Sequence, residues 1–103
     1  MIYIFWSCQN KEEAKKVINH LLEKRFIACA SIFPVESFYL WKGNIAQGEE
    51  VKVVFKTEKS LYSSVEKEIL LFCSYEVPEI IQIDVSQGYK PYLSWIAQET
   101  TAL

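Results

Sequence analysis

Residues 28–41 carry the longest strand pattern in the chain, because β-branched and aromatic side chains recur along the whole segment. A Lys-Gly-Asn turn sequence follows at 42–44, and after a short polar loop residues 51–56 form another strand pattern. The two segments predict an antiparallel hairpin that is longer than a compact domain of this size needs. Pro34 interrupts the first arm, so we expect a bend, a bulge or an edge position there.

A strand and a helix precede the hairpin. Residues 1–7 are rich in aromatic and β-branched types and predict the first strand. Asn10 is placed to be a helix N-cap, with Glu13 three residues later as its capping-box partner. An amphipathic helix of roughly three to four turns should follow. Its apolar residues at helical spacing are Ala14, Val17, Ile18, Leu21 and Leu22.

A second helix and a fourth strand follow the hairpin. Ser60 is the predicted N-cap of this helix, and apolar residues within 61–72 fall on one face. Residues 80–85 form the strand pattern, and a short terminal helix is expected over 91–98 because proline suits its first turn. The order β-α-β-β-α-β predicts an α+β, ferredoxin-like sandwich with an antiparallel sheet. We expect it to form one domain over residues 1–103.

Large apolar side chains lie on both sides of the predicted strands. Half of the residues are hydrophobic and 15% are aromatic, although a small domain has little interior for large rings. Two helices would cover one sheet face, so a polar second face is expected if that face meets water. The alternating sets are instead Ile2, Ile4 and Trp6 against Tyr3 and Phe5, and Phe38 and Leu40 against Tyr39 and Trp41. We therefore expect copies of the chain to bury this surface, unless the terminal helix covers it within one chain.

Charge and cysteine content exclude several classes of protein. The formal net charge is −2 with both signs mixed, which argues against nucleic-acid binding and against a polybasic membrane patch. No apolar run approaches the length that spans a bilayer. The apolar start is short and precedes charged residues 11–13, so it predicts a first strand rather than a signal peptide. Three cysteines, an odd number, predict free thiols in a reducing, cytoplasmic compartment.

Seven short segments form an ordered set across nearly the whole chain. They are FIAC at 26–29, IFP at 32–34, SFYLWKG at 37–43, EEV at 49–51, FKT at 55–57, YEVPEI at 75–80 and PYLSWI at 91–96. Together these segments resemble the CutA family of divalent-cation tolerance proteins. The chain departs from that pattern at 73–74, where Cys-Ser replaces the His-Pro of many relatives, and at Val35, where some relatives have glycine. The first change replaces a possible imidazole ligand by a thiol.

The resemblance implies a ferredoxin-like protomer in a tight homotrimer, with sheet edges and long hairpins joined between subunits. It also implies a part in divalent-cation tolerance, and copper binding is ascribed to some members of the family. The residues that the resemblance groups around a cleft between subunits are Tyr39, Trp41, Glu50, Lys56, Tyr75, Glu76, Glu79 and Tyr92.

Two kinds of ligand chemistry are open to these residues. Carboxylates and phenols offer hard oxygen donors for Mg²⁺, Ca²⁺ or Mn²⁺, and a carboxylate beside Lys56 can hold its charge in a cleft. Thiols suit copper, but without a C-x-x-C spacing a copper site would take one thiol from each of three subunits. Cys8 is expected to be the most exposed thiol, then Cys73, with Cys29 buried. Alternatively, these are interface and core residues, with Glu–Lys pairs formed between subunits.

The sequence predicts a binding protein rather than an enzyme. It has no Gly-rich phosphate loop, no nucleophile elbow and no Cys–His pair at a meaningful spacing. The first hypothesis is a homotrimeric divalent-cation tolerance protein that binds copper, another divalent cation or a small ligand at intersubunit clefts. The alternatives are a PII-like small-molecule sensor, by analogy of fold, and a trimeric assembly module without a ligand.

Overall fold

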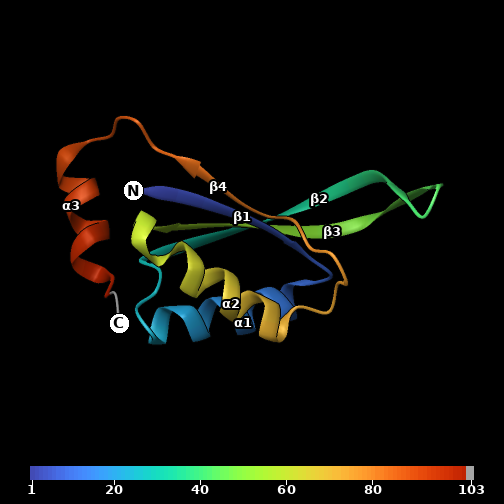
Figure 1. Cartoon of the computed structure of the whole chain (residues 1–103), viewed down its shortest axis with the longest axis horizontal. Coiled ribbons are helices and arrows are strands. Elements are labelled where there is room, and N and C mark those ends of the chain that lie inside the picture. Colours follow the sequence, from blue (N-terminus) through green and yellow to red (C-terminus); the bar gives the residue numbers. More distant parts are fainter. Residues whose placement is uncertain (102–103) are drawn as a thin grey trace.

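The computed structural model describes residues 1–101, and Figure 1 shows the arrangement of their helices and strands. The elements are β1 (Ile2–Cys8), α1 (Lys11–Glu23), β2 (Cys29–Trp41), β3 (Asn44–Thr57), a 3₁₀ turn (Lys59–Leu61), α2 (Tyr62–Phe72), β4 (Ile80–Asp84) and α3 (Lys90–Glu99). This order confirms the predicted α+β, ferredoxin-like arrangement with a terminal helix. In the described range, none of the helices has the length and apolar character that crossing a membrane requires.

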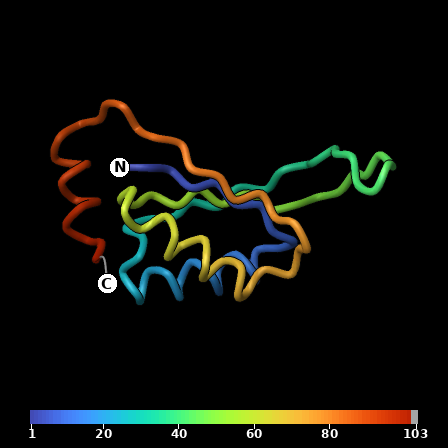
Figure 2. The backbone as a smooth tube through the Cα atoms, in the orientation of Figure 1, coloured from blue at the N-terminus to red at the C-terminus, as the bar shows by residue number. Residues whose placement is uncertain are grey.

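The strands form one antiparallel sheet in which β1 is central. The order within residues 1–101 is β2-β3-β1-β4, so β2 and β4 are the sheet edges. Helices α1 and α2 lie on one side of the sheet, and α3 lies at the end of the sheet near the N-terminus (Figure 1). The far half of the β2–β3 hairpin projects beyond the helices (Figure 2). One sheet face and the hairpin are therefore left without a helix.

The hairpin is longer than the sequence predicted. Asn44 already pairs with Trp41, so the prediction of a polar loop after the turn was wrong, and residues 45–50 belong to β3. Their backbone groups join the ladder of β2 whatever their side chains are, because strand pairing satisfies the main chain. Lys42 and Gly43 have positive φ angles of 50° and 83°, the geometry of a two-residue type I′ turn. Such a tight turn brings the strands together at once.

Pro34 occupies an edge position, which was one of the three predicted alternatives. It lies on β2 opposite Val51, and the register continues unshifted on both sides of it. Proline has no N–H to donate, and the outer side of an edge strand needs no donor. The long strand therefore accepts Pro34 without a bulge in its pairing with β3.

The helix starts follow the sequence in one case and depart from it in the other. The Oδ1 atom of Asn10 accepts a hydrogen bond from the backbone N–H of Glu13 at 2.9 Å, which confirms the N-cap of α1. The Glu13 carboxylate does not complete a capping box, because it accepts from the N–H and the hydroxyl of Ser74, each at 2.9 Å. Ser60 lies inside the 3₁₀ turn, and α2 begins at Tyr62 without a side-chain cap. The predicted Ser60 cap was therefore wrong.

The helix-covered face of the sheet carries the core. Ile2, Ile4 and Trp6 of β1 are at most 1% exposed, and the Trp6 ring stacks on Phe55 of β3 with a centroid separation of 6.0 Å. Complete burial of an aliphatic side chain stabilises a fold by about 1.5–3 kcal/mol. The helices contribute the buried side chains of Val17 and Leu21 from α1 and of Val65 and Ile69 from α2.

The opposite face of the sheet is apolar and uncovered. Tyr3 and Phe5 of β1 are only partly buried there, and their neighbours on β4, Ile81 and Ile83, are 46% and 49% exposed. Because α3 lies at one end of the sheet, it leaves this open face bare (Figure 1). The alternative in which the terminal helix covers the face does not hold for the described residues.

Candidate functional site

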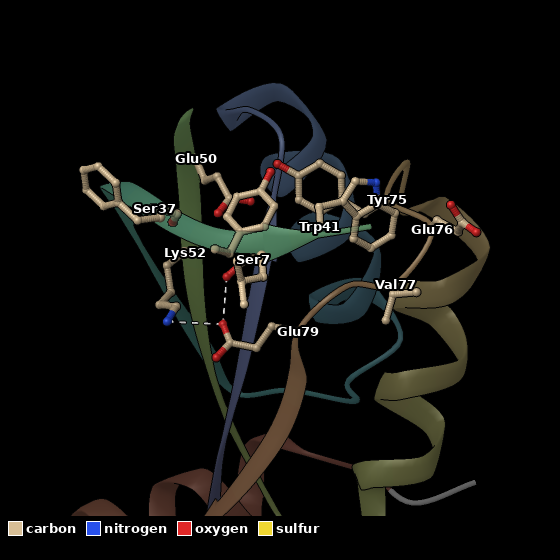
Figure 3. A pocket seen from close by; sticks show the side chains of 12 residues that line it. Ser7, Ser37, Trp41, Glu50, Lys52, Tyr75, Glu76, Val77 and Glu79 are labelled. Atoms are coloured by element: carbon tan, nitrogen blue, oxygen red, sulfur yellow. Dashed lines mark hydrogen bonds and ion pairs between the residues drawn. The ribbon is translucent and has the colours of Figure 1, made fainter. Parts of the chain in front are cut away.

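A cavity lies where the hairpin leaves the body of the sheet. Its volume is about 640 Å³, and its walls come from β1, β2, β3 and the segment that joins α2 to β4. Figure 3 shows this pocket with its lining side chains as sticks. Of the eight cleft residues named from the sequence, the six that line it are Tyr39, Trp41, Glu50, Tyr75, Glu76 and Glu79.

Strand register builds the floor of the pocket. Ser7 of β1 lies directly opposite Lys52 of β3, and Glu50 lies two residues away on the same face because strand side chains alternate. The Ser7 hydroxyl donates to Oε1 of Glu79 at 2.7 Å, and Nζ of Lys52 lies 3.2 Å from the same oxygen (Figure 3). The carboxylate of Glu79 is therefore held by two partners from two strands.

Sequence reasoning missed Ser7 and Lys52. A signal for Lys52 was present, since it stands two positions from Glu50 in a strand and must share its face. No comparable signal marked Ser7, because its partner depends on the pairing of β1 with β3. Within one protomer Glu79 pairs with Lys52 and not with Lys56, whereas the Glu–Lys pairs expected between subunits stay a prediction.

The aromatic wall comes from two distant parts of the chain. Tyr39 and Trp41 stand on the hairpin arm of β2, and Tyr75 follows α2. Figure 3 shows Trp41 and Tyr75 next to one another, with Glu50 on the opposite side of the pocket. Burial, and then the hydrogen bond to Glu50, raise the pKa of Tyr75 well above its ordinary value. The phenol therefore keeps its proton at neutral pH beside the Glu50 carboxylate.

Lys56 and Tyr92 lie elsewhere. Lys56 is four residues from Lys52 on the same strand face, about 13 Å away along β3. It pairs in register with Tyr3 and Cys29, and its Nζ atom lies 5.8 Å from the centre of the Tyr3 ring. Burial opposes its charge, but Cys29, Tyr92 and Tyr3 together raise the pKa of Lys56. The eight predicted residues thus divide into the pocket and a second group near the other end of the open face.

The cysteines do not form a metal site within one protomer. Cys8 is fully buried, so the expectation that it is the most exposed thiol was wrong; the β1 register turns it toward the helices. Burial first, and then Glu13, raise the pKa of Cys8 to about 12, which disfavours the thiolate that binds metals. Cys73 is partly exposed, and so is Cys29, so the expectation that Cys29 is buried was wrong; neither is in a disulfide. Residues 1–101 contain no group of three His, Cys, Asp or Glu side chains that could hold a metal ion.

The chain resembles known proteins along nearly its whole length. The sequence model of the family described as "CutA1 divalent ion tolerance protein" matches residues 2–99. The divalent-cation tolerance protein CutA of Pyrococcus horikoshii is 37% identical over 100 residues, which cover 97% of this chain and 98% of that one. Human protein CutA is also 37% identical over 100 residues, covering 96% of this chain but 56% of the human one. The chain therefore spans about half the length of such mammalian relatives.

Solved structures agree with the sequence matches. The crystal structure of CutA1 from Pyrococcus horikoshii has a TM-score of 0.94 and 36% identity, covering 99% of this chain and 100% of that one. The Archaeoglobus fulgidus protein, described as the periplasmic divalent cation tolerance protein CutA, has a TM-score of 0.93 and 34% identity, with 96% and 98% of the two chains covered. The chain belongs to the CutA1 divalent ion tolerance family.

Proposed function

We propose that this protein works as a homotrimer that binds a small ligand, or a metal ion held by several subunits, in clefts between its copies. The observation that carries the proposal is the position of the pocket, which opens beside an uncovered apolar sheet face on a projecting hairpin. If neighbouring copies pack on the uncovered sheet face, the same contact would bury its apolar side chains and close the pocket into a cleft between subunits. The membership of the family adds a role in divalent-cation tolerance to this proposal.

Exposed apolar surface supports the assembly. Ile81 and Ile83 are about half exposed on the open face, and Leu40 and Ile45, opposite one another near the hairpin tip, are 76% and 83% exposed. Each Å² of apolar surface that leaves water contributes about 25 cal/mol. The edge strands β2 and β4 also present unpaired backbone groups, which favour pairing with another chain.

The pocket supports a small ligand over a metal ion bound by one subunit. It has aromatic walls with a few fixed polar groups, which is the usual composition of small-molecule sites. A metal ion would need donors from more than one copy, with the partly exposed thiols of Cys29 and Cys73 as the candidates for copper. The same pocket favours a sensor or ligand-binding role, as in the PII-like alternative, over a pure assembly module.

A binding role in the cytoplasm completes the proposal. The pocket contains Ser7 and Ser37 but no cysteine or histidine, so no conventional nucleophile–base pair lines it. We therefore propose that the protein is not an enzyme. The free thiols at Cys8, Cys29 and Cys73 fit a reducing compartment.

Light scattering coupled to size-exclusion chromatography tests the assembly. The proposal predicts a mass three times that of the chain at micromolar concentration. A stable monomer that behaves well at that concentration would remove the shared cleft together with the trimer.

Titration tests the ligand. Calorimetry with Cu²⁺ and Zn²⁺ compares wild type with a variant in which all three cysteines are serine, and a thermal-shift screen adds nucleotides, carboxylates and amines. A ligand should raise the melting temperature as expected from RT ln(1 + [L]/Kd). Saturable metal binding that the serine variant lacks supports the metal, whereas stabilisation by an organic compound alone supports the small ligand. Flat responses to both would count against any ligand.

A further inference from the structure

The pocket combines aromatic rings with carboxylates. Phe38, Tyr39 and Trp41 are 63%, 47% and 41% exposed in one protomer, and all three line the pocket. The faces of such rings carry negative electrostatic potential and attract cations. Glu50, Trp41 and Tyr75 all line this pocket, and Figure 3 shows Glu50 on one side of it with Trp41 and Tyr75 on the other. A cation that entered the pocket would therefore meet ring faces and carboxylates on the walls of the same cavity.

The charge of the lining is unbalanced. Three glutamates line the pocket against one lysine, and that lysine, Lys52, is already paired with Glu79. Among the described residues, Glu50 and Glu76 form no salt bridge. An anionic ligand would face these carboxylates without a free ammonium group in the lining. The site in one protomer therefore favours a positive ligand.

The negative field continues beyond the pocket. Glu50 also borders an adjoining groove of about 410 Å³, together with Glu36, Glu49 and a single lysine, Lys11. Glu36 and Glu49 lie directly opposite each other on β2 and β3. Like charges in that position destabilise a strand pair by about 0.2–1 kcal/mol. Because strand side chains alternate, this pair lies on the hairpin face opposite to Glu50, so it adds negative charge near the pocket without lining it.

The structure also shows that the Trp41 ring accepts a cation. Nζ of Lys42, the next residue, lies 5.6 Å from the centre of this ring. A metal ion fits less well than an organic cation, because no group of three donors is formed within residues 1–101. Alkylated ammonium ions lose water easily and bind to ring faces, whereas a metal ion needs a shell of ligands in place of water.

We propose that the pocket binds a small alkylated ammonium ion, with the cationic head between the aromatic wall and the carboxylate of Glu50. The inference rests on the proposed function, since it names the ligand class of the same site. The cavity of about 640 Å³ is within the range of pockets that hold small molecules. Tyr75 has the role of a positioning residue, since its ring lines the same pocket as Glu50 and its hydroxyl keeps its proton beside that carboxylate.

Choline and its neutral isostere 3,3-dimethyl-1-butanol provide the direct test, because they differ in charge but hardly in shape. Binding is measured on the whole protein by NMR, from the indole N–H signal of Trp41, and by calorimetry. Choline is expected to shift that signal in a saturable way and to bind at least about tenfold more tightly than the neutral isostere. Equal binding of the two compounds would overturn the proposal.

Two variants test the residues, each with a matched control. Trp41→Leu should weaken choline binding about threefold to tenfold, and Trp95→Leu is its control because both tryptophans are 41% exposed. Glu50→Gln keeps an acceptor for Tyr75 but removes the charge, and should weaken binding about tenfold. Glu23→Gln, on the exposed side of α1, removes one acidic group far from the pocket. Melting curves confirm that each variant is folded, and binding unchanged in both test variants would contradict the assignment.

The outcomes separate this inference from the proposal on which it rests. If choline fails but a neutral or anionic compound shifts the Trp41 signal, the ligand class is wrong and the ligand site stands. If no compound shifts it, both the class and the ligand part of the proposed function are wrong. The mass of the assembly is measured separately, so neither result decides the trimer.

Discussion

Both faces of the sheet carry large apolar side chains, but their surroundings are opposite. On β1, Ile2, Ile4 and Trp6 are enclosed by α1 and α2, whereas Tyr3 and Phe5 on the other side meet no helix. The first face closes the fold of one protomer, and the second presents apolar side chains beside Ser7, Lys52 and Lys56 without a helix over them. The comparison teaches that apolar patterning predicts burial but not whether the cover comes from the same chain.

Among substitutions that compare the two faces of the sheet, a truncation of Trp6 should cause the largest loss of stability. Trp6→Ala opens a cavity in the closed face and should lower the free energy of unfolding by about 3–5 kcal/mol, measured by urea denaturation. Phe5→Ala, the neighbour on the open face, should act mainly through association, so its effect should grow as the protein is diluted. If the loss of unfolding free energy in Trp6→Ala depended on protein concentration as strongly as the loss in Phe5→Ala, the two faces would not differ in the way proposed.

A smaller substitution, Trp6→Phe, tests how much of the stability at this position comes from packing of the ring. Its Nε1 atom is buried without a hydrogen-bond partner among the described residues. Trp6→Phe removes this unpaired donor while it keeps a ring against Phe55. We expect it to cost clearly less than Trp6→Ala, since an unsatisfied buried N–H costs about 1–3 kcal/mol in the wild type.

A charge on the open face should dissociate the assembly. Ile81 pairs with Phe5 in register, so Ile81→Lys places an ammonium group in the centre of the uncovered surface. Light scattering should then report a monomer with an unchanged far-ultraviolet circular dichroism spectrum. Leu71→Lys is the control, because Leu71 is 68% exposed on α2, away from that face. An oligomer that survives Ile81→Lys would show that the open face is not the interface.

The closed side also contains an ion cluster whose pH dependence can be measured. Glu68 of α2 accepts from Nζ of Lys24 at 3.0 Å and lies 3.2 Å from Nε2 of His20, both on or next to α1. Lys24 first, and then His20, lower the pKa of Glu68 against the opposing effect of burial. A carboxyl with a lower pKa in the folded state stabilises the protein above its unfolded pKa. This stability is lost as pH falls through the folded pKa.

The unfolding free energy should therefore fall as pH drops below the ordinary pKa of a glutamate, about 4.3, and through the lower pKa of Glu68 in the folded protein. Glu68→Gln should remove part of this slope, measured by urea denaturation across the pH range. Glu23→Gln, exposed on the same side of the molecule, should leave the slope unchanged. If the unfolding free energy of Glu68→Gln depended on pH as strongly as that of wild type, groups other than Glu68 would cause the loss of stability in acid.

The order of the elements could be predicted because periodicity and capping are local. The Asn10 cap and the alternation in residues 1–7 needed only a few neighbouring residues. The pocket could not be assembled in this way, since Ser7 and Glu79 meet through pairings between distant strands. The burial of Cys8 was missed for the same reason: a strand end looks exposed until the position of α2 is known.

Part of the missing information was nevertheless present in the turn. A two-residue type I′ turn at 42–43 fixes which residues of β2 and β3 face one another along the whole hairpin. If the turn is assigned this way, Glu50 lies opposite Val35 and Lys52 opposite Phe33. The acidic pair of Glu36 and Glu49 would then be predicted from the sequence as well. Only the contributions of β1 and of the segment after α2 would still depend on the tertiary fold.

The ion pair in the pocket should give the smallest effect. Lys52 and Glu79 are 30% and 35% exposed, so solvent screens their attraction, and a double-mutant cycle with Lys52→Met and Glu79→Gln should give less than about 1 kcal/mol. If a neighbouring copy covers the pocket, the pair loses water and its coupling energy should rise with protein concentration, as the oligomer forms. Urea denaturation at two protein concentrations measures this change. A coupling energy that is the same at both concentrations would mean that the pocket stays open to solvent, and the contrast between the closed and open faces would then extend to the assembled protein.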